Sequence, residues 1–416
     1  MNPVITVVGI GADGWEGLAP RSRDVVLAAE VLLGGARHLA MLPSVAAVVE
    51  PWPSPLRPNL DALLGRHLDR RVVVLASGDP LVSGIGTTLI ELLGPDAVEV
   101  LPAVSSVALA RARMRWSAES TDVVTVVGRD VDAARRYFGA GRRLIVLSSD
   151  RTTPAELARL LAVDGFGASR LTVLSNLGVG DESRIEGTAL AWDDTPVPNL
   201  NIVCVDCRAD TPTRPGYSTS PGLPDDAYAN DGQLTKHLIR AAALAALAPM
   251  PGQLLWDVGG GAGSIGIEWM RTDPRCQAIA VERDPARAAR ITANARRLGV
   301  PGLQVVTGSA PAALDELALP DAVFLGGGVA QEGNLAACWN AMLPGGRLVA
   351  HAVTLEGEMA LISQWQRRGG ELSRISLEQA APLGSLSGWT PRRPVTQWAV
   401  TIPFTDTELT NDGVFL

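Results

Sequence analysis

Two apolar runs in this chain each continue directly into a glycine-rich turn. In ITVVGIGADGWEG, Gly9, Gly11 and Gly14 have the spacing G-x-G-x-x-G, and LLWDVGGGAGSIGIEW repeats it from Gly261 to Gly266. A strand followed by such a turn brings the backbone close to a ligand at the amino end of a helix, as in dinucleotide-binding folds. The pattern therefore predicts an α/β fold and raises the question of which ligand each turn serves.

Short apolar runs alternate with helical segments on both sides of one interruption. Residues 208–225 are rich in Pro, Ser, Thr and Gly and have no hydrophobic period, so they are predicted to form a linker. We therefore expect one α/β domain at 1–207 and a second at 226–416. The first domain should include a helix over residues 21–35 that ends at glycine.

The composition excludes several classes of protein. The chain has 44 acidic and 36 basic residues and a net charge of −8, which argues against a nucleic-acid-binding protein. There is neither an apolar stretch of membrane-spanning length nor a basic leader, so we expect a cytoplasmic protein without a membrane partner. We also expect a homo-oligomer. Cys204 and Cys207 should be buried strand residues and not metal ligands, and we expect no metal ion.

Two acidic side chains accompany the second glycine run. Asp257 precedes the glycines, and Glu282 ends the next expected strand. A carboxylate at Glu282 can accept hydrogen bonds from both hydroxyls of a ribose, which NAD and S-adenosylmethionine (SAM) share. Asp257 can organise the loop or contact a methionine ammonium, and GSAPAAL follows one strand later. These features favour SAM over a dinucleotide or a purely structural turn.

Residues 230–360 resemble the decarboxylating precorrin methyltransferase domain of cobalamin biosynthesis, which has a Rossmann-like class I SAM-dependent methyltransferase fold. The matching stretches are GQLTKHLIR, LLWDVGGGAGSIGIEW, AVERDPARAARITANARRLGV, GSAPAAL, DAVFLGGG and LPGGRLVAHAVTLE. The resemblance implies SAM contacts from Thr235, Gly259, Gly260, Gly261, Ala262, Gly263, Glu282 and Ala310. Ala262 stands where that family more often has Thr, so any hydrogen bond from that hydroxyl to the ligand is lost here.

The first glycine run fits a dinucleotide-binding turn poorly, because WEGLAPRS separates it from the next long helix, which should start near Pro20. Residues 1–207 instead resemble the tetrapyrrole methylase family, on the ordered stretches ASGDPLVSGIG, LPAVSSVALA, NLG with DES, and NLNIVCVD. That family holds SAM in a cleft between two α/β subdomains. The resemblance implies SAM contacts at Gly9, Gly11, Asp79, Val82, Ser105 and Ser106.

Two SAM domains in this order resemble the bifunctional precorrin methyltransferases. The resemblance implies that the N-terminal domain methylates a precorrin-6 tetrapyrrole at C5. It implies that the C-terminal domain methylates C15 and decarboxylates the ring C acetate, giving precorrin-8, with one SAM in each domain. Two alternatives stay open: a small-molecule methyltransferase whose N-terminal half only binds substrate or a partner, and a regulatory SAM-binding module without turnover.

Few catalytic side chains are required for this chemistry. A meso carbon is nucleophilic and a sulfonium is activated, so methyl transfer depends mainly on alignment. Decarboxylation can use a general acid or proton relay, for which the matched motifs offer Lys236 and His351 foremost, then His237 and Glu356. Arginines that could bind substrate carboxylates, or be solvated surface residues, are Arg111, Arg113, Arg115, Arg392 and Arg393.

Overall fold

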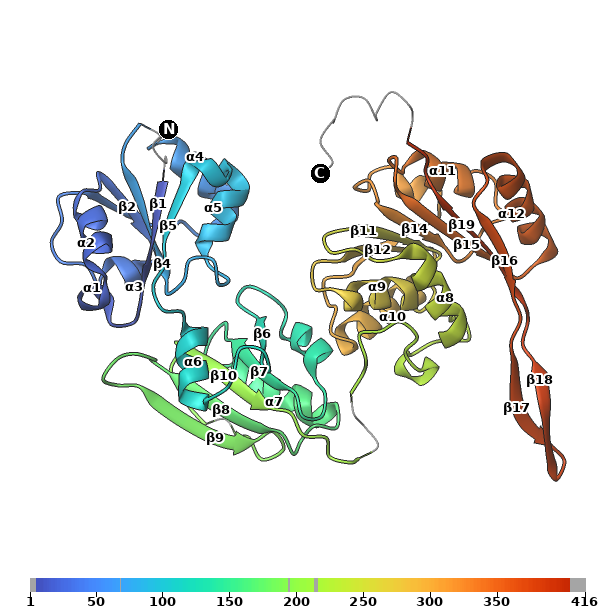
Figure 1. The fold of residues 1–416 in the computed structure, drawn as a ribbon, viewed down its shortest axis with the longest axis horizontal. Coiled ribbons are helices and arrows are strands. Elements are labelled where there is room, and N and C mark those ends of the chain that lie inside the picture. The colour runs from blue at the N-terminus through green and yellow to red at the C-terminus, as the bar shows by residue number, and fades with distance from the viewer. Residues whose placement is uncertain (1–4, 68, 194, 213–215, 405–416) are drawn as a thin grey trace. The chain divides into compact units, whose positions relative to one another are not determined.

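The computed structural model describes residues 5–67, 69–193, 195–212 and 216–404 (Figure 1). The chain divides into two compact units, Met1–Gly216 and Tyr217–Leu416. Each unit combines sheets with helices, as the alternating sequence pattern predicts. Within the described residues, no helix is both long enough and apolar enough to cross a membrane.

The first sheet of the N-terminal unit is parallel throughout. In spatial order its strands are β3 (Val48–Pro51), β2 (Val31–Gly34), β4 (Val72–Ser77), β1 (Ile5–Ile10) and β5 (Val98–Leu101). The accompanying helices are α1 (Gly14–Gly17), α2 (Pro20–Leu27), α3 (Ala36–Leu39), η1 (Arg57–Asn59), α4 (Leu60–Gly65), α5 (Ile85–Leu93) and η2 (Pro95–Ala97). Alternate side chains of β1 enter two separate apolar clusters, one on each face of the sheet.

The expected helix over residues 21–35 is wrong in its second half. The helix α2 begins at Pro20, as expected, but ends at Leu27, and Val31–Gly34 forms the strand β2 between β3 and β4. All four residues of β2 are buried. A short apolar run that is buried on both faces has no helical or strand period, so its sequence does not distinguish the two structures.

The second sheet of this unit is mixed. In spatial order its strands are β6 (Asp122–Thr125), β7 (Arg143–Leu147), β10 (Asn201–Asp206), β8 (Arg170–Ser175) and β9 (Ser183–Thr188). It is accompanied by α6 (Ser106–Met114), η3 (Val131–Tyr137) and α7 (Thr153–Val163). Apolar residues of α6 and α7 enter different clusters, so the two helices cover opposite faces. Cys204 and Cys207 are buried, as expected, and burial raises the pKa of their thiols to about 12 and about 11.

The main sheet of the C-terminal unit has five parallel strands, followed by two strands joined through antiparallel pairing, so that only the sixth strand in spatial order runs against the rest. Its order is β13 (Gln304–Thr307), β12 (Gln277–Glu282), β11 (Leu254–Val258), β14 (Ala322–Leu325), β15 (Arg347–Ala352), β19 (Val395–Thr401) and β16 (Glu371–Ile375). Its helices are η4 (Asp225–Ala227), α8 (His237–Leu247), α9 (Ser264–Thr272), α10 (Pro285–Arg297), η5 (Ala312–Leu314), α11 (Asn334–Asn340) and α12 (Leu355–Arg368). The strand order reverses at β11, because β12 and β13 lie on one side of it and β14 and β15 on the other. Ligands of open α/β sheets bind at such a point. A separate hairpin of β17 (Glu378–Leu383) and β18 (Leu386–Pro391) extends from this unit (Figure 1).

The second half of the expected linker is part of the C-terminal unit. The backbone N–H groups of Gly222 and Leu223 donate to the carboxylate of Glu268 at 2.6 and 3.1 Å, and the side chain of Leu223 is buried. The Tyr228 hydroxyl donates to the same carboxylate at 2.8 Å. The composition of this segment is typical of a linker, and it gives no sign that the backbone N–H groups of Gly222 and Leu223 bind the buried carboxylate of Glu268.

The buried cation Arg240 explains why this segment is fixed. Its guanidinium is fully buried, donates to Glu268 at 2.5 Å, and also donates to the carbonyl oxygens of Leu223 and Thr235. A buried ion pair is tolerated only when its remaining donors and acceptors are satisfied. Residues 222–235 therefore wrap around Arg240 and bring Thr235 and its neighbours to the carboxyl ends of the strands.

This contact predicts how the C-terminal unit responds to truncation. A fragment of residues 217–416 should unfold cooperatively in urea, whereas a fragment of residues 229–416 should be less stable by at least about 2 kcal/mol, because Glu268 loses three hydrogen-bond donors. Tryptophan fluorescence follows unfolding of both fragments, since Trp256 and Trp269 are buried in this unit. Equal stability of the two fragments would contradict the assignment of residues 217–228 to this unit.

Candidate functional site

Two buried carboxylates hold the glycine loop between β11 and α9. Gly266 N–H donates to Asp257 Oδ2 at 3.0 Å, and Gly261 N–H donates to Glu282 Oε2 at 2.8 Å. The side chains of Asp257 and Glu282 are almost completely buried. The pKa of Asp257 is raised to about 7, chiefly by burial; the hydrogen bond from Gly266 opposes this rise, and the negative charge of Glu282 adds to it. The loop is thus fixed at its two ends by side chains from neighbouring strands.

A cavity of about 200 Å³ lies beside Glu282. Its lining includes four of the expected SAM contacts, namely Gly259, Gly261, Glu282 and Ala310. A Cβ placed on Gly259 would lie 3.0 Å from Gly327 N, so the two loops that bound the cavity approach closely. A Cβ on Gly327 would meet no atom within 4 Å, which leaves open space above its backbone.

A larger cavity of about 630 Å³ adjoins the same glycine loop. Gln233, Gly259, Gly261 and Gly326 line both cavities, so the two spaces are neighbours. Thr235, Asp257 and Gly260 line only the larger one. Ala262 and Gly263 line neither: Ala262 is buried in the apolar core, and a Cβ on Gly263 would lie 2.6 Å from Ile291. These two residues shape the loop from behind.

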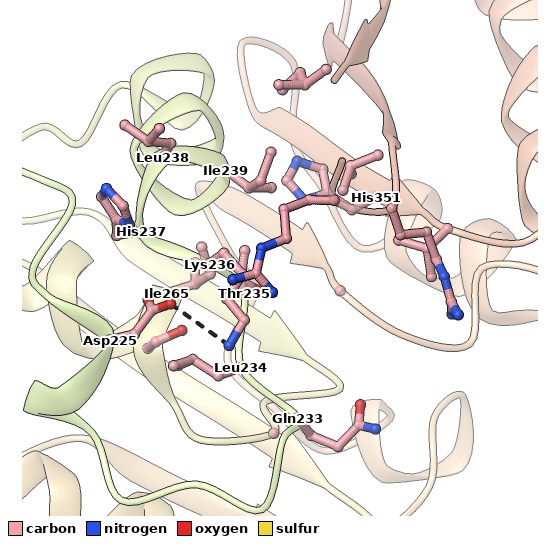
Figure 2. Close-up of a pocket in the computed structure, with 18 of the residues that line it drawn as sticks. Asp225, Gln233, Leu234, Thr235, Lys236, His237, Leu238, Ile239, Ile265 and His351 are labelled. Carbon is pink, nitrogen blue, oxygen red and sulfur yellow. Dashed lines mark ion pairs between the residues drawn. The ribbon is translucent and has the colours of Figure 1, made fainter. Parts of the chain in front are cut away.

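Lys236 lines the larger cavity and forms an ion pair with Asp225 (Figure 2). The distance from Lys236 Nζ to Asp225 Oδ2 is 3.6 Å, and half of the lysine side chain is exposed. Asp225 is held from behind by the buried Arg240, whose Nη1 lies 3.4 Å from Asp225 Oδ1. The ammonium of Lys236 is therefore kept at the cavity wall.

His351 also lines this cavity, but it is buried. Its Nε2 lies 2.8 Å from Gln397 Oε1, and its ring meets Phe324 edge-on with 5.0 Å between ring centroids. Burial lowers the pKa of His351, against the effect of the Gln397 hydrogen bond, so the imidazole is neutral near pH 7. His237 is a further lining residue, whereas Glu356 is exposed in the first turn of α12 and does not line this cavity.

Two of the candidate arginines line the larger cavity and three do not. Arg392 and Arg393 are exposed at the edge of this cavity. Nε and Nη2 of Arg392 donate hydrogen bonds to Oε1 of Gln379 at 2.9 and 2.7 Å. The other three arginines, Arg111, Arg113 and Arg115, lie on or at the end of α6. Arg113 forms a two-pronged ion pair with Glu182 at 2.5 and 2.8 Å, so its charge is already balanced.

The N-terminal unit has a cavity of about 230 Å³ between residues of its two sheets. Five of the six expected SAM contacts line it, namely Gly11, Asp79, Val82, Ser105 and Ser106. Asp79 Oδ1 accepts a hydrogen bond from Leu81 N at 2.9 Å, and Ser105 Oγ caps α6 by accepting from Ala108 N at 3.1 Å. Both side chains thus shape their loops as well as facing the cavity.

Gly9 does not line this cavity. A Cβ on Gly9 would overlap the carbonyl oxygen of Gly78 and lie 2.6 Å from Ala103 N. The residue is therefore glycine because the loops after β4 and β5 pass directly over the end of β1. Its role is close packing, whereas Gly11, the other glycine expected to contact SAM from this turn, lines the cavity.

The fold also brings residues to this cavity that no sequence motif indicates. They include Arg37 and Ser148. Arg37 Nη2 lies 2.8 Å from Nε2 of His38, and burial together with the charge of Arg37 lowers the pKa of His38 to about 4. The neutral imidazole therefore orients Arg37 without balancing its charge. The sequence pattern does not indicate Arg37 as a cavity residue, because it predicts a helix where the preceding strand β2 lies.

Two family models match the chain: residues 4–191 match the tetrapyrrole (corrin/porphyrin) methylases, and residues 226–402 match the precorrin methyltransferase domain. A Mycobacterium tuberculosis protein named precorrin-6Y C(5,15)-methyltransferase (decarboxylating) is 48% identical over 96% of this chain and 100% of its own length. A Sinorhizobium protein of the same name is 44% identical over 96% of this chain and 97% of its own length.

A solved structure matches part of the chain. The crystal structure of the C-terminal domain of precorrin-6Y C5,15-methyltransferase from Rhodobacter capsulatus covers 44% of this chain and 100% of its own, with 46% identity and a TM-score of 0.43. The expected fold class, a tetrapyrrole methylase domain followed by a Rossmann-like methyltransferase domain, is confirmed by the family matches and the sheet topology. This chain belongs to the precorrin-6Y C5,15-methyltransferase (decarboxylating) family.

Proposed function

We propose that this protein transfers methyl groups from SAM to C5 and C15 of a precorrin-6 tetrapyrrole and releases the ring C acetate as CO2, giving precorrin-8 for cobalamin biosynthesis. The N-terminal unit methylates C5, and the C-terminal unit methylates C15 and decarboxylates. The observation that carries this proposal is that each unit has a cavity at the carboxyl ends of its parallel strands, lined by the residues that the sequence marks for SAM. Relatives over the whole length are enzymes with both activities in their names, which disfavours a regulatory module.

The residues of the C-terminal unit fit SAM, which supplies an activated methyl group when bound. Each oxygen of Glu282 accepts one backbone hydrogen bond, from Gly261 or Asp284, and retains a lone pair for a ribose hydroxyl. Gly327 leaves room for the ligand beside its backbone, and Gly259 allows the two loops that bound the cavity to pack closely. Thr235 and Asp257 line the adjoining larger cavity and would bind the methionine end.

The N-terminal cavity would hold a second SAM, so that each chain binds one molecule per unit. Its glycine turn offers backbone at Gly11, and Asp79 brings a carboxylate to a cavity that must accept a cationic sulfonium. Its polar lining from the second sheet, Ser148 and Asn201, supplies neutral hydrogen-bonding groups. A cytoplasmic, homo-oligomeric enzyme remains part of the proposal.

The larger cavity of the C-terminal unit would bind the tetrapyrrole. Its substrate carries several carboxylates, whereas the protein has a net charge of −8, so local cations must attract it. Lys236, Arg392 and Arg393 provide these charges. Guanidinium groups bind carboxylates in a two-pronged geometry, which also orients the macrocycle.

We propose Lys236 as the proton donor of the decarboxylation. The bond between the acetate methylene and the carboxylate breaks, CO2 leaves, and the electron pair passes into the conjugated macrocycle. The methylene carbon then takes a proton from the Lys236 ammonium, which is reprotonated by water. Asp225 holds this ammonium at the cavity wall. His351, which is neutral, contributes a hydrogen-bonding wall and no charge.

The N-terminal assignment predicts a selective defect in the variant Asp79→Arg. A cation at this position would repel the sulfonium and fill the cavity, so C5 methylation should be lost while C15 methylation and decarboxylation continue. Mass spectrometry should then detect a product with one methyl group added and one CO2 lost. The matched variant Asp79→Asn keeps the oxygen that Leu81 N–H uses and should retain folding. A doubly methylated product at the normal rate from Asp79→Arg would remove Asp79 from the site.

The C-terminal assignment predicts weaker SAM binding in Glu282→Ala. A hydrogen bond to a charged group contributes about 1.5–3 kcal/mol, so affinity measured by calorimetry on the unit 217–416 should fall at least about tenfold. Because Glu282 also holds Gly261 N–H, Glu282→Gln serves as the control that retains one acceptor oxygen for the loop. Unchanged SAM affinity in Glu282→Ala, or heat from NAD with none from SAM in the wild type, would contradict the assignment.

A further inference from the structure

We propose that the buried floor of the 630 Å³ cavity is the subsite that receives the acetate lost as CO2, and that it promotes this loss by offering the carboxylate no cation. The floor is defined here as the lining residues Ile239, Phe324, His351, Ile375 and Val395. This inference rests on the proposed function. It adds a physical reason why one of the substrate's several carboxylates is lost as CO2 and the others are kept.

The floor residues differ from the charged lining residues of the cavity in how far they are buried. Ile239, Phe324, His351 and Val395 are between 2% and 8% exposed. Ile375 is half-buried on β16 and lies opposite Val395 on β19. The cationic side chains, Lys236, Arg392 and Arg393, are exposed at the edge of the cavity. The cavity therefore has a charged mouth and an apolar floor.

No lysine or arginine stands among the five floor residues, and the one ionisable group there is neutral. His351 is neutral because burial lowers its pKa, and its Nε2 is engaged by Gln397. Asp257, another buried lining residue, is a carboxyl group whose Oδ2 accepts from Gly266, so it supplies no positive charge. A carboxylate that reaches this floor thus leaves water without gaining an ion pair.

This environment favours loss of CO2 for a physical reason. An ionised carboxylate is destabilised where neither water nor a cation stabilises it, whereas the departing CO2 is neutral and apolar. In the transition state the charge leaves the carboxyl oxygens for the macrocycle, so an interaction that stabilises only the carboxylate would raise the barrier. Carboxylates bound at the mouth by Arg392 and Arg393 keep that stabilisation, and they anchor the substrate without reacting. Lys236, also at the mouth, gives its proton to the methylene carbon only after CO2 has left.

Placing a cation on the floor tests the inference. The variant Ile375→Lys puts an ammonium beside the acetate, because Ile375 lines the cavity and is only half-buried. Calorimetry without SAM should show the tetrapyrrole substrate binding at least about threefold more tightly to the full-length variant, through the new ion pair. In turnover with SAM, decarboxylation should slow at least about tenfold relative to C15 methylation, so mass spectrometry should detect methylated product that retains the carboxylate.

Two control variants separate charge from damage. Ile375→Met changes the side chain without adding charge and should keep the wild-type product ratio. Ser376→Lys adds the same charge at an exposed neighbour that does not line the cavity, and it should also keep that ratio. If Ile375→Lys does not fold, Ile375→Arg, which puts a different cation at the same floor position, is tested in the same way.

The outcomes distinguish this inference from the proposed function. If the wild-type protein transfers no methyl group to the tetrapyrrole, the proposed function is wrong. If the wild type is active but the lysine variant binds substrate more weakly, or decarboxylates and methylates in the normal ratio, the floor is not the acetate subsite. Tighter binding together with slower decarboxylation supports it, because a merely damaged site would not bind its substrate better.

Discussion

In both units the cavity depends on two loops that approach more closely than a side chain would allow. Gly9 at the end of β1 packs under Gly78, which follows β4, and a Cβ at Gly9 would overlap the Gly78 carbonyl oxygen. In the C-terminal unit, Gly259 after β11 packs against Gly327 after β14. Each pair of strands is parallel and adjacent, so the two loops leave the same edge of the sheet. The glycines let these loops cross the strand ends and leave a cavity beside their backbones.

Buried charges then fix the loops of the C-terminal unit. Asp257 and Glu282 hold the glycine loop at two backbone N–H groups. On its other side, the Arg240–Glu268 pair holds the segment that carries Thr235 and Lys236. A buried charge without hydrogen-bond or ionic partners would be strongly destabilising, so both networks favour the observed positions of their loops. The residues proposed to bind the ligand are therefore held in place without it, which would reduce the ordering cost of binding.

Much of the C-terminal site could be predicted from the sequence, because its signals are local. Asp257, the glycines and Glu282 each stand at the end of a strand with a clear apolar pattern, and the sheet topology brings these ends together. The misses were of another kind. The strand β2 has no periodicity to distinguish it from a helix, and Arg37 follows that strand. The contacts of residues 222–228 with Glu268 join segments far apart in the chain. Gly9 has a steric role that only the neighbouring loops reveal.

The central claim is that one chain carries two separate SAM sites, one in each unit. Equilibrium titration of the full-length protein with SAM, by calorimetry or by dialysis with labelled ligand, tests it most directly. Two molecules of SAM bound per chain is the result that the two cavities predict. A stoichiometry of one, with saturation of a single site that Asp79→Arg leaves intact, would contradict the claim and would leave the N-terminal unit as a domain that binds only substrate or a partner.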